Sequence, residues 1–260
     1  MPALPRARKR FGQHFLTDRH YVDRIVRAIA PARDDAMVEI GPGTGILTRE
    51  LIAHVAHLDV VEIDRDLAAA LRAEFPRDRV SVHEADALDF DFASLPAPLR
   101  VVGNLPYNVS TPILFRVASI ADRLRDAVFM LQKEVVERMV AAPDTPEYGR
   151  LSVMLQYRFA MALALRVPPG AFTPPPKVDS AVVRMAPLAA TRLRARDETL
   201  FARIVAASFE QRRKMLRSAL RALVTAEAFE AAGIDAARRG ETLSVAEFVA
   251  LADAAATRAG

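Results

Sequence analysis

The segment Asn104-Leu105-Pro106-Tyr107 combines an amide, a backbone carbonyl and an aromatic ring directly after a strand-like apolar run. Pro106 has no N–H and restricts Leu105 to an extended conformation, so the Leu105 carbonyl can point into a cleft. Together with the Asn104 amide oxygen it forms a pair of acceptors that suits an exocyclic amine with two N–H donors. Tyr107 adds a ring face on which a planar base can stack. The competing interpretation is an ordinary strand-ending turn capped by asparagine.

This combination of groups predicts chemistry on the amino group of adenine. The N6 lone pair of adenine is delocalised into the ring, which makes the nitrogen a poor nucleophile. Two acceptors on its hydrogens favour a pyramidal nitrogen with the lone pair aimed at an electrophile, and no strong base is needed before attack. The electrophile that fits is a methyl group on a sulfonium, and catalysis would consist mainly of positioning and electrostatics.

A glycine loop and two carboxylates predict the nucleoside pocket that such an electrophile needs. Gly41, Gly43 and Gly45 lie between a strand-like run and a helical pattern, where backbone amides can approach a ligand closely. The spacing G-x-G-x-G is one residue shorter than the dinucleotide fingerprint. Glu62 ends the next strand, where an acidic side chain can accept ribose hydroxyls, and Asp86 ends the third, in line with an adenine amino group. A tight turn beside two solvated carboxylates is the alternative.

The elements that must position these residues alternate between strands and helices. Near-continuous apolar strands separated by helical patterns indicate a parallel sheet covered on both faces, in the α/β class. The expected strands are residues 37–41, 58–64, 80–86, 99–104, 127–131, 158–167 and 179–185, and the expected helices are residues 45–56, 65–75, 111–120 and 132–140. From about Pro187 the pattern is helical throughout. We therefore predict a sheet domain with a basic N-terminal arm over residues 1–186 and a smaller, all-helical domain over residues 187–260.

Composition narrows the possible functions. The 260 residues are 52% hydrophobic and carry a formal net charge of +4, which suits an ordered protein and hints only weakly at an anionic partner. The absence of cysteine excludes disulfides, thiolate nucleophiles and cysteine-based zinc sites. The histidines and carboxylates show no metal-ligand spacing, and the sequence has no signal peptide or membrane-spanning run. We expect a metal-free cytoplasmic protein.

Basic residues gather where they could contact nucleic acid. The candidates are Arg8, Lys9, Arg10, Lys177, Arg213, Arg217 and Arg221, with Lys177 and Arg184 as the weaker ones. Three of these arginines recur at intervals of four residues on the expected C-terminal helix, which suits phosphate contacts that position RNA without reading its sequence. A solvated helix face is the alternative for such a charge pattern.

Several long motifs give the chain a resemblance to a known family, the ribosomal RNA adenine N6,N6-dimethyltransferases, and within it to the bacterial small-subunit branch. The motifs are RKRFGQHFL (8–16), EIGPGTG (39–45), VVEIDRD (60–66), GNLPYNVSTPILF (103–115), FMLQKEVVERM (129–139), YGRLSV (148–153), FTPPPKVDSAVVR (172–184) and FEQRRKMLRSAL (209–220). The resemblance covers nearly the whole chain. It implies a Rossmann-like class I methyltransferase sheet, with a helical C-terminal domain that binds rRNA.

The resemblance also assigns residues. It implies S-adenosylmethionine as the cofactor, held by His14, Leu16, Glu62, Asp86, Asn104 and the glycine loop at Gly41, Gly43 and Gly45. The catalytic group is implied to be Asn104-Leu105-Pro106-Tyr107, and Phe172 is expected to sandwich the target base opposite Tyr107. The family usually reads G-Q-N-F-L near the N-terminus, and here His14 replaces that asparagine. If the family contact uses backbone atoms, the replacement is harmless.

The implied reaction is N6,N6-dimethylation of two neighbouring adenosines in the 3′-terminal hairpin of 16S rRNA. The implied context is late maturation of the 30S subunit by a monomeric enzyme. Three alternatives remain open from the sequence. A 23S-directed resistance methyltransferase is the nearest, and a non-catalytic assembly factor would keep the fold without the chemistry. A nicotinamide dehydrogenase is disfavoured by the short glycine spacing and by the lack of an evident hydride-transfer acid or base.

Overall fold

The structure is a computed structural model that describes residues 13–189, 194–211 and 213–257. The chain divides into two compact units. The first contains the described residues up to Val136 together with Met161–Pro187, and the second contains Glu137–Ala160 with the described residues from Leu188 onward. The predicted division into two continuous segments at residues 186 and 187 therefore differs from the structure, because residues 137–160 pack with the helical unit.

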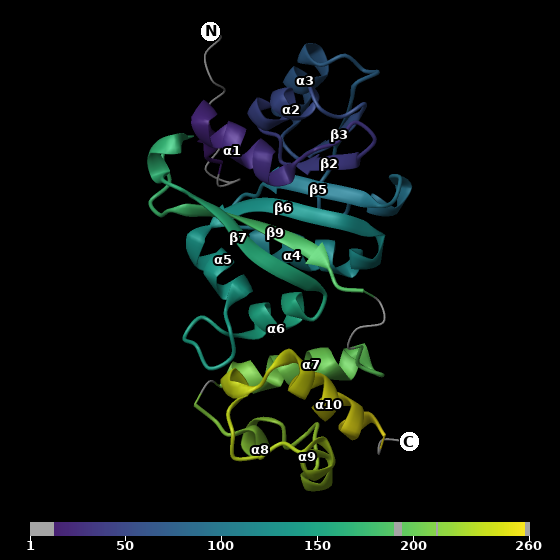
Figure 1. The fold of residues 1–260 in the computed structure, drawn as a ribbon, viewed down its shortest axis with the longest axis vertical. Helices are drawn as coiled ribbons and strands as arrows, with labels where there is room; N and C mark the ends of the chain where they lie inside the picture. Colours follow the sequence, from purple (N-terminus) through teal and green to yellow (C-terminus); the bar gives the residue numbers. More distant parts are fainter. Residues whose placement is uncertain (1–12, 190–193, 212, 258–260) are drawn as a thin grey trace. The chain divides into compact units, whose positions relative to one another are not determined.

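The first unit is built on a mixed sheet (Figure 1). Among the described residues its strands are ordered β4-β3-β2-β5-β6-β9-β7. Their bounds are β2 Ala36–Ile40, β3 Leu58–Glu62, β4 Val80–Glu84, β5 Leu99–Asn104, β6 Leu124–Gln132, β7 Phe159–Val167 and β9 Ser180–Pro187. The strands from β4 to β6 pair in parallel, as predicted, whereas β9 pairs antiparallel with β6. The predicted α/β class is confirmed, with this antiparallel pair as a departure from an all-parallel sheet.

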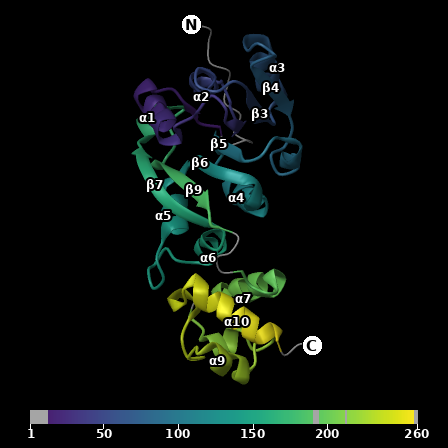
Figure 2. The ribbon, with the colours of Figure 1, turned by 45° about the vertical axis from the view of Figure 1, so that its right-hand side comes forward.

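The direction of the chain across the sheet reverses between β2 and β5. From β2 the chain adds β3 and β4 on one side, and from β5 it adds β6 on the other. Because parallel crossovers are right-handed, the helices between the first strands and the helix between β5 and β6 must cover opposite faces. These helices are α2 Ile46–Leu51, α3 Arg65–Glu74 and α4 Ser110–Ser119, and Figures 1 and 2 show α2 and α4 on opposite sides. Ligands bind at such a reversal, beyond the carboxyl ends of the strands.

Two very short strands attach the N-terminal segment to the proline-rich loop. β1, Phe15–Leu16, pairs antiparallel with β8, Phe172–Thr173. The backbone N–H of Thr17 also donates to the Ala171 carbonyl at 2.8 Å. Helix α1, Arg19–Ile29, follows after its N-cap Asp18, whose side chain accepts from the His20 N–H. Residues 13–17 are thereby held against residues 171–174, far away in sequence.

The remaining elements of the first unit are short or lie at its end. They are the 3₁₀ turns η2 Phe92–Ser94, η3 Ala121–Arg123 and η4 Pro169–Ala171, and helix α5 Lys133–Val140, which continues into the second unit. Several predicted elements differ in length from the observed ones. The helix predicted over residues 45–56 ends at Leu51, and the strand predicted over residues 127–131 extends from Leu124 to Gln132.

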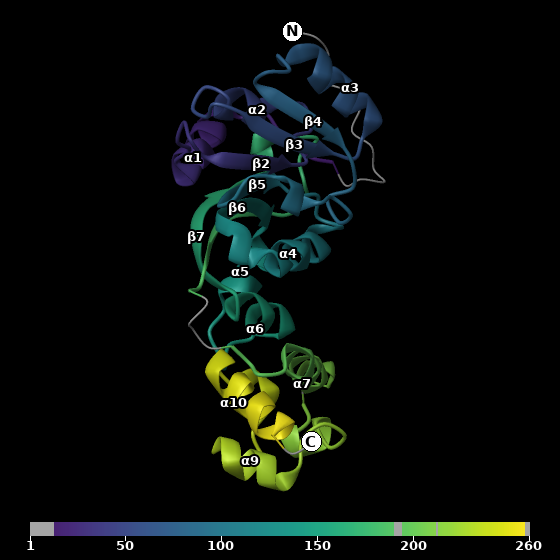
Figure 3. The ribbon, with the colours of Figure 1, turned by 90° about the vertical axis from the view of Figure 1, so that its right-hand side faces the viewer.

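Apart from the first two residues of β7, the regular elements of the second unit are helical in its described residues (Figure 3). Its elements are α6 Arg150–Gln156, α7 Glu198–Glu210, α8 Leu216–Ala219, α9 Ala226–Ala232, η5 Gly240–Thr242 and α10 Val245–Ala256. α10 packs against both α7 and α9. The segment before α6 joins this core through Tyr148, whose hydroxyl donates to the Leu243 carbonyl at 2.8 Å. A capping box between Ser244 and Glu247 begins α10.

The predicted helix carrying Arg213, Arg217 and Arg221 on one face is wrong. α7 ends at Glu210, and α8 contains only the middle arginine of the three. The N-cap of α8, Met215, is extended, and the N–H of Leu216 donates to the Arg238 carbonyl instead of to a preceding turn. Pairing with residues 236–238 therefore replaces a continuous helix, which a helical spacing pattern cannot reveal.

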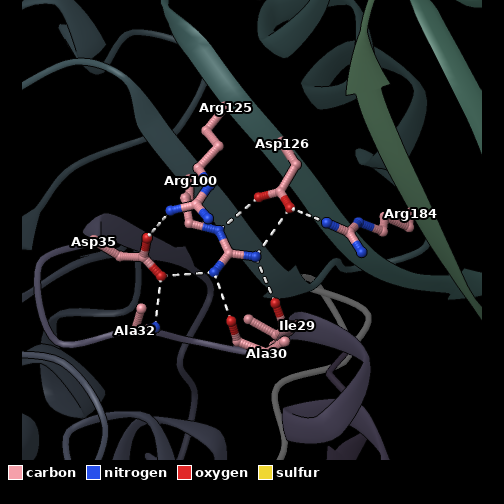
Figure 4. Close-up of polar contacts among 8 residues, drawn as sticks. All are labelled: Ile29, Ala30, Ala32, Asp35, Arg100, Arg125, Asp126 and Arg184. Atoms are coloured by element: carbon pink, nitrogen blue, oxygen red, sulfur yellow. Dashed lines mark hydrogen bonds and ion pairs between the residues drawn. The ribbon is translucent and has the colours of Figure 1, made fainter.

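A buried arginine connects α1 to the sheet (Figure 4). Arg100 on β5 is 2% exposed, and its guanidinium pairs with Asp126 on β6 at 2.7 Å and with Asp35 at 2.6 Å. It also donates to the carbonyls of Ile29 and Ala30, at the C-terminus of α1, where helical carbonyls lack partners. Burial opposes the charged form, but the two carboxylates outweigh it and raise the pKa of Arg100 above its usual value. Each buried charged group of this network, Arg100, Asp35 and Asp126, therefore has an oppositely charged partner.

Two half-exposed arginines complete this network from outside. Arg125 reaches the second oxygen of Asp35 at 2.6 Å, and Arg184 on β9 reaches Asp126 at 2.9 Å. Each buried carboxylate is therefore shared between Arg100 and one outer arginine. Arg184, a weaker candidate for phosphate contact, is thus engaged in an intramolecular ion pair.

Candidate active site

A cavity lies at the carboxyl ends of the central strands, where the chain direction reverses. Ile40 on β2 pairs with Val61 on β3 and with Gly103 on β5. Consequently the residues that follow these three, Gly41, Glu62 and Asn104, lie at the same edge of the sheet. The predicted site residues that line the cavity are His14, Leu16, Gly41, Gly43, Glu62, Asp86, Asn104, Leu105, Pro106 and Tyr107. The register of three parallel strands is what gathers residues from distant parts of the sequence.

The glycine loop wraps around the Glu62 carboxylate. Gly41, Gly43 and Gly45 all have positive φ, between 58° and 75°, a region that side chains disfavour. Glu62 is 4% exposed and accepts from the N–H of Gly43 at 3.1 Å and from the N–H of Asp64 at 2.9 Å. Burial raises the pKa of Glu62 above its usual value, although these two hydrogen bonds oppose the effect. The loop and the second strand therefore hold this carboxyl group in a fixed orientation.

Asp86 and Gly45 differ in how they relate to the cavity. One carboxylate oxygen of Asp86 accepts from the Leu88 N–H at 2.9 Å, which leaves its second oxygen as an acceptor at the cavity wall. Gly45 does not line the cavity. A Cβ at this position would lie 3.0 Å from the side chain of Leu71 on α3, so this glycine allows the start of α2 to pack closely. The sequence-based assignment of Gly45 to ligand binding has no support in this geometry.

The orientation of Asn104 is set by the N-terminal segment. Its Nδ2 donates to the backbone carbonyl of His14 at 3.1 Å, so Oδ1 remains as an acceptor at the cavity. Leu105 donates its N–H to the Met130 carbonyl at 3.1 Å, and no described residue donates to the Leu105 carbonyl. The two oxygens that the sequence singled out thus remain available to an amine donor.

Tyr107 is fixed at both ends of its side chain. Its hydroxyl lies 2.7 Å from the Ser180 hydroxyl on β9. Its ring stacks on the imidazole of His14, with centroids 5.6 Å apart and an interplanar angle of 29°. Burial raises the pKa of Tyr107, with the Ser180 hydrogen bond opposing it, so the phenol stays protonated at neutral pH.

The base-sandwich role expected for Phe172 stays a prediction, and the structure places this side chain in the hydrophobic core. It is 3% exposed, belongs to β8 and packs into the hydrophobic core of the first unit with Leu16. It does not line the cavity. In this structure the ring that faces Tyr107 belongs to His14, because the β1–β8 pairing buries Phe172 beneath the N-terminal segment.

A buried acid that the sequence analysis missed also lines the cavity. Glu39 on β2 is 1% exposed, and its carboxyl group accepts from the Thr48 hydroxyl on α2 at 2.6 Å. Burial, with a smaller contribution from the nearby Glu62, raises the pKa of Glu39 to about 7, against an ordinary value of 4.5. The signal that could have revealed it is an acidic residue inside an apolar, doubly covered strand, where charged side chains are rare.

Replacing Glu39 by glutamine is expected to stabilise the ligand-free protein at pH 8 but much less at pH 5. A raised folded-state pKa favours folding below pH 4.5, and this contribution is lost as the pH rises through about 7. The difference between the folded-state pKa of about 7 and the ordinary value of 4.5 corresponds to about 3 kcal/mol of unfolding free energy. Glutamine keeps an acceptor for Thr48 and has no charge to bury. Urea denaturation at both pH values measures the effect, and a constant difference between the two proteins would contradict it.

The control for that experiment is Glu134→Gln. Glu134 on α5 is exposed to solvent, so its carboxyl group carries no burial cost. This variant should therefore follow the wild-type dependence of stability on pH.

The predicted RNA contacts lie in several environments. Arg8, Lys9 and Arg10 are outside the described residues. The side chains of Lys177, Arg213, Arg217 and Arg221 are exposed. Within the described ranges, no group of three or more histidine, aspartate or glutamate residues is placed to hold a metal ion. Nor does any helix of those ranges have the length and apolar character to cross a membrane.

Comparisons with known proteins identify related chains. The family model described as "Ribosomal RNA adenine dimethylase" matches residues 5–257. Ribosomal RNA small subunit methyltransferase A of Aromatoleum aromaticum is 58% identical over 246 residues, covering 95% of this chain and 93% of the relative. The protein of the same name from Thiobacillus denitrificans is 57% identical, covering 96% of this chain and 98% of the relative.

Solved structures share the fold. A dimethyladenosine transferase from Plasmodium falciparum superposes with a TM-score of 0.79 at 24% identity, covering 92% of this chain and 96% of that one. The 23S rRNA methyltransferase ErmE superposes with a TM-score of 0.71 at 27% identity, covering 92% of this chain and 98% of that one. Both likenesses span the two units of the chain.

Proposed function

Because the chain belongs to the ribosomal RNA adenine dimethylase family, it is an S-adenosylmethionine-dependent rRNA adenine dimethyltransferase, and we propose that its substrate is 16S rRNA. In this proposal it dimethylates N6 of two adjacent adenosines in the 3′-terminal hairpin loop, late in 30S subunit biogenesis. The sequence identity of 57–58% to small-subunit methyltransferases, against 27% to the 23S enzyme, favours this substrate over 23S rRNA. The nicotinamide dehydrogenase alternative is wrong, because the family has a different chemistry.

The cavity fits S-adenosylmethionine in its donor set. Glu62 would accept the ribose hydroxyls, and the second oxygen of Asp86 would accept from the adenine amino group of the cofactor. The glycine loop at Gly41 and Gly43 offers close backbone approach, and the backbones of His14 and Leu16 complete the wall. The carboxyl groups of Glu39 and Glu62 line the same cavity, and a bound sulfonium cation would favour their ionised forms. When bound, the cofactor supplies an electrophilic methyl group.

The observation that carries the proposal is the orientation of Asn104. Its Nδ2 is committed to the His14 carbonyl, so Oδ1 and the Leu105 carbonyl can both accept from the N6 hydrogens of a target adenine. Two acceptors direct the N6 lone pair away from the ring plane. The N6–methyl bond would form as the methyl–sulfur bond of the cofactor breaks, with the neutral thioether as leaving group, and the two oxygens would hold the N6 hydrogens until the surplus proton passes to water. Tyr107 supplies a stacking face, so positioning and electrostatics account for the catalysis.

RNA binding is proposed for the basic residues that the sequence analysis singled out. Arg213, Arg217 and Arg221 of the helical unit, Lys177 of the proline-rich loop, and Arg8, Lys9 and Arg10 would contact phosphates. Adenine N6 is paired inside a helix, so the target must be unstacked from a loop. Action as a monomer is part of this proposal. We infer a cytoplasmic site of action from the proposed substrate.

Methyl transfer to isolated ribosomal subunits tests the proposal. Under-methylated 30S subunits and 50S subunits are incubated separately with the protein and tritiated S-adenosylmethionine, and labelled nucleotides are mapped. Label on two adjacent adenosines of the 16S terminal hairpin is the expected result. Label on the 50S subunit alone would favour 23S rRNA, and no transfer to either subunit would favour a non-catalytic assembly factor.

A further inference from the structure

Glu39 is a buried acid of the cavity that the proposed methyl transfer leaves without a task. We propose, on the basis of that proposed function, that Glu39 makes the cavity select the positively charged cofactor over its neutral product. Its carboxyl group loses a proton when the sulfonium binds and regains one when the methyl group has left. Glu39 is thus a specificity-determining residue that needs no contact with the RNA.

Glu39 lies on the strand between the two groups that must flank the methyl donor. Its strand, β2, pairs with β3 on one side and with β5 on the other. Glu62 at the end of β3 is the proposed acceptor for the ribose, and Asn104 at the end of β5 is the proposed acceptor for the target amine. The sulfur of the cofactor joins the ribose to the transferred methyl group. It therefore belongs between these two strands, over the end of β2.

The surroundings of Glu39 disfavour a permanent negative charge. The side chain is 1% exposed, and one carboxyl oxygen accepts from the Thr48 hydroxyl at 2.6 Å. Among the described residues no group donates to the other oxygen, and no lysine or arginine pairs with this carboxyl group. A carboxylate buried with one neutral donor takes up a proton readily, and burial accordingly raises the pKa of Glu39 to about 7. At neutral pH the group is therefore balanced between its two forms.

Other ionisable groups near Glu39 have contacts of their own. The titratable side chains that share the cavity are His14, Glu62, Asp86 and Tyr107. The charged side chains of the adjoining β3, β5 and α2 that lie outside it pair elsewhere, and they are Asp59, Arg100, Arg49 and Glu50. Glu62 repels an ionised Glu39 and thereby adds to its raised pKa. Unlike Glu39, Glu62 accepts from two backbone N–H groups, which support its own negative charge.

The charge on the sulfur then determines the protonation of Glu39. A bound sulfonium favours the carboxylate, so the proton of Glu39 passes to water. Methyl transfer leaves a neutral thioether, the surplus proton of N6 passes to water, and Glu39 regains a proton from water. By linkage, S-adenosylmethionine binds more tightly as the pH rises through about 7, whereas S-adenosylhomocysteine gains nothing from the ionised form.

Calorimetric titrations with S-adenosylmethionine and S-adenosylhomocysteine at pH 6 and pH 8 test this role. Relative to Glu39→Gln, the wild type is expected to shift its ratio of the two dissociation constants about tenfold toward the cofactor at pH 8. The ionised fraction of a group with a pKa of about 7 rises by about this factor over the interval. Glu134→Gln removes an exposed acid outside the cavity and should behave as the wild type. Ionisation of the ligands themselves is common to all three proteins and cancels in the comparison.

A second variant and a second readout address the proton directly. Thr48→Val keeps the carboxyl group of Glu39 but removes a hydrogen bond that favours its ionised form, so the midpoint of the pH dependence should move upward. Titrations at pH 7 in buffers of different ionisation enthalpy count the released protons. The wild type should release about half a proton more than Glu39→Gln on binding S-adenosylmethionine, and no more on binding S-adenosylhomocysteine.

The outcomes distinguish this role of Glu39 from the proposed function. If the wild type and Glu39→Gln select between the two ligands with the same pH dependence, the response belongs to Glu62 or His14, and the role of Glu39 is wrong while the function stands. An unchanged midpoint in Thr48→Val, or equal proton release by the wild type and Glu39→Gln, would also overturn it. Failure of the wild type to bind either ligand would instead contradict the proposed function.

Discussion

Replacing Asn104 by alanine is expected to reduce kcat for methyl transfer to 30S subunits by a factor of about 100 to 1,000. The substitution removes one of the two oxygens that would hold the N6 hydrogens, and such an electrostatic contact acts mainly in the transition state. It also removes a single hydrogen bond to the His14 carbonyl at a half-buried position. We therefore expect a folded protein whose melting temperature lies within about 4 °C of the wild type, as a loss near 1 kcal/mol allows.

Single-turnover transfer from tritiated S-adenosylmethionine measures this effect, and Asn104→Asp is the matched variant. Aspartate keeps an acceptor oxygen but cannot donate to the His14 carbonyl. The hydrogen bond that orients the side chain is therefore lost. It should retain more activity than alanine and less than asparagine. Wild-type turnover by a folded Asn104→Ala protein would remove the acceptor role of Asn104 from the mechanism.

Replacing Arg100 by methionine is expected to lower the unfolding free energy by about 3–5 kcal/mol. The side chain is 2% exposed, and its loss leaves Asp35 and Asp126 buried with only one half-exposed arginine each. The carbonyls of Ile29 and Ala30 also lose their donor at the end of α1. The midpoint of urea denaturation measures the loss, with unchanged slope if the transition remains cooperative.

Two companion variants separate a broken ion pair from a lost side chain. Arg125→Met removes an arginine whose side chain is 55% exposed, while Asp35 keeps Arg100, so it should cost less than about 1 kcal/mol. Adding Asp35→Asn and Asp126→Asn to Arg100→Met removes the uncompensated charges and should recover a large part of the stability. Equal destabilisation by Arg100→Met and Arg125→Met would contradict the role of burial.

The sequence predicted the central sheet and most of the cavity, because both depend on local signals. Runs of apolar residues mark strands that are covered on both faces, and Glu62, Asp86 and Asn104 stand directly at or after their ends. Parallel pairing then brings such residues to one edge by geometry alone. The resemblance to a family supplied the cofactor and the substrate class, which strand patterns do not contain.

The features that sequence reasoning missed depend on contacts between distant segments. β1 and β8 have two residues each, too few for any periodicity, yet their pairing buries Phe172 and brings His14 to Tyr107. Glu39 is hidden in an apolar strand, and its partner Thr48 becomes evident only when α2 is folded over β2. Likewise, the spacing of arginines after α7 resembles a helix, although the N–H groups of Leu216 and Arg217 bond to residues 236–238.

The route of the chain through its two units bears on how such a protein could arise in evolution. The boundaries fall after Val136, Ala160 and Pro187, so the polypeptide passes from one unit to the other three times. Tyr148, Val153 and Tyr157, encoded before the last strand of the sheet, belong to the same core as Phe201 and Phe248. A recombination event that appended or deleted only the end of the gene would split the helical core, because residues 137–160 would be separated from the residues after Pro187. The helical unit therefore cannot be transferred whole by adding or removing only the end of the gene.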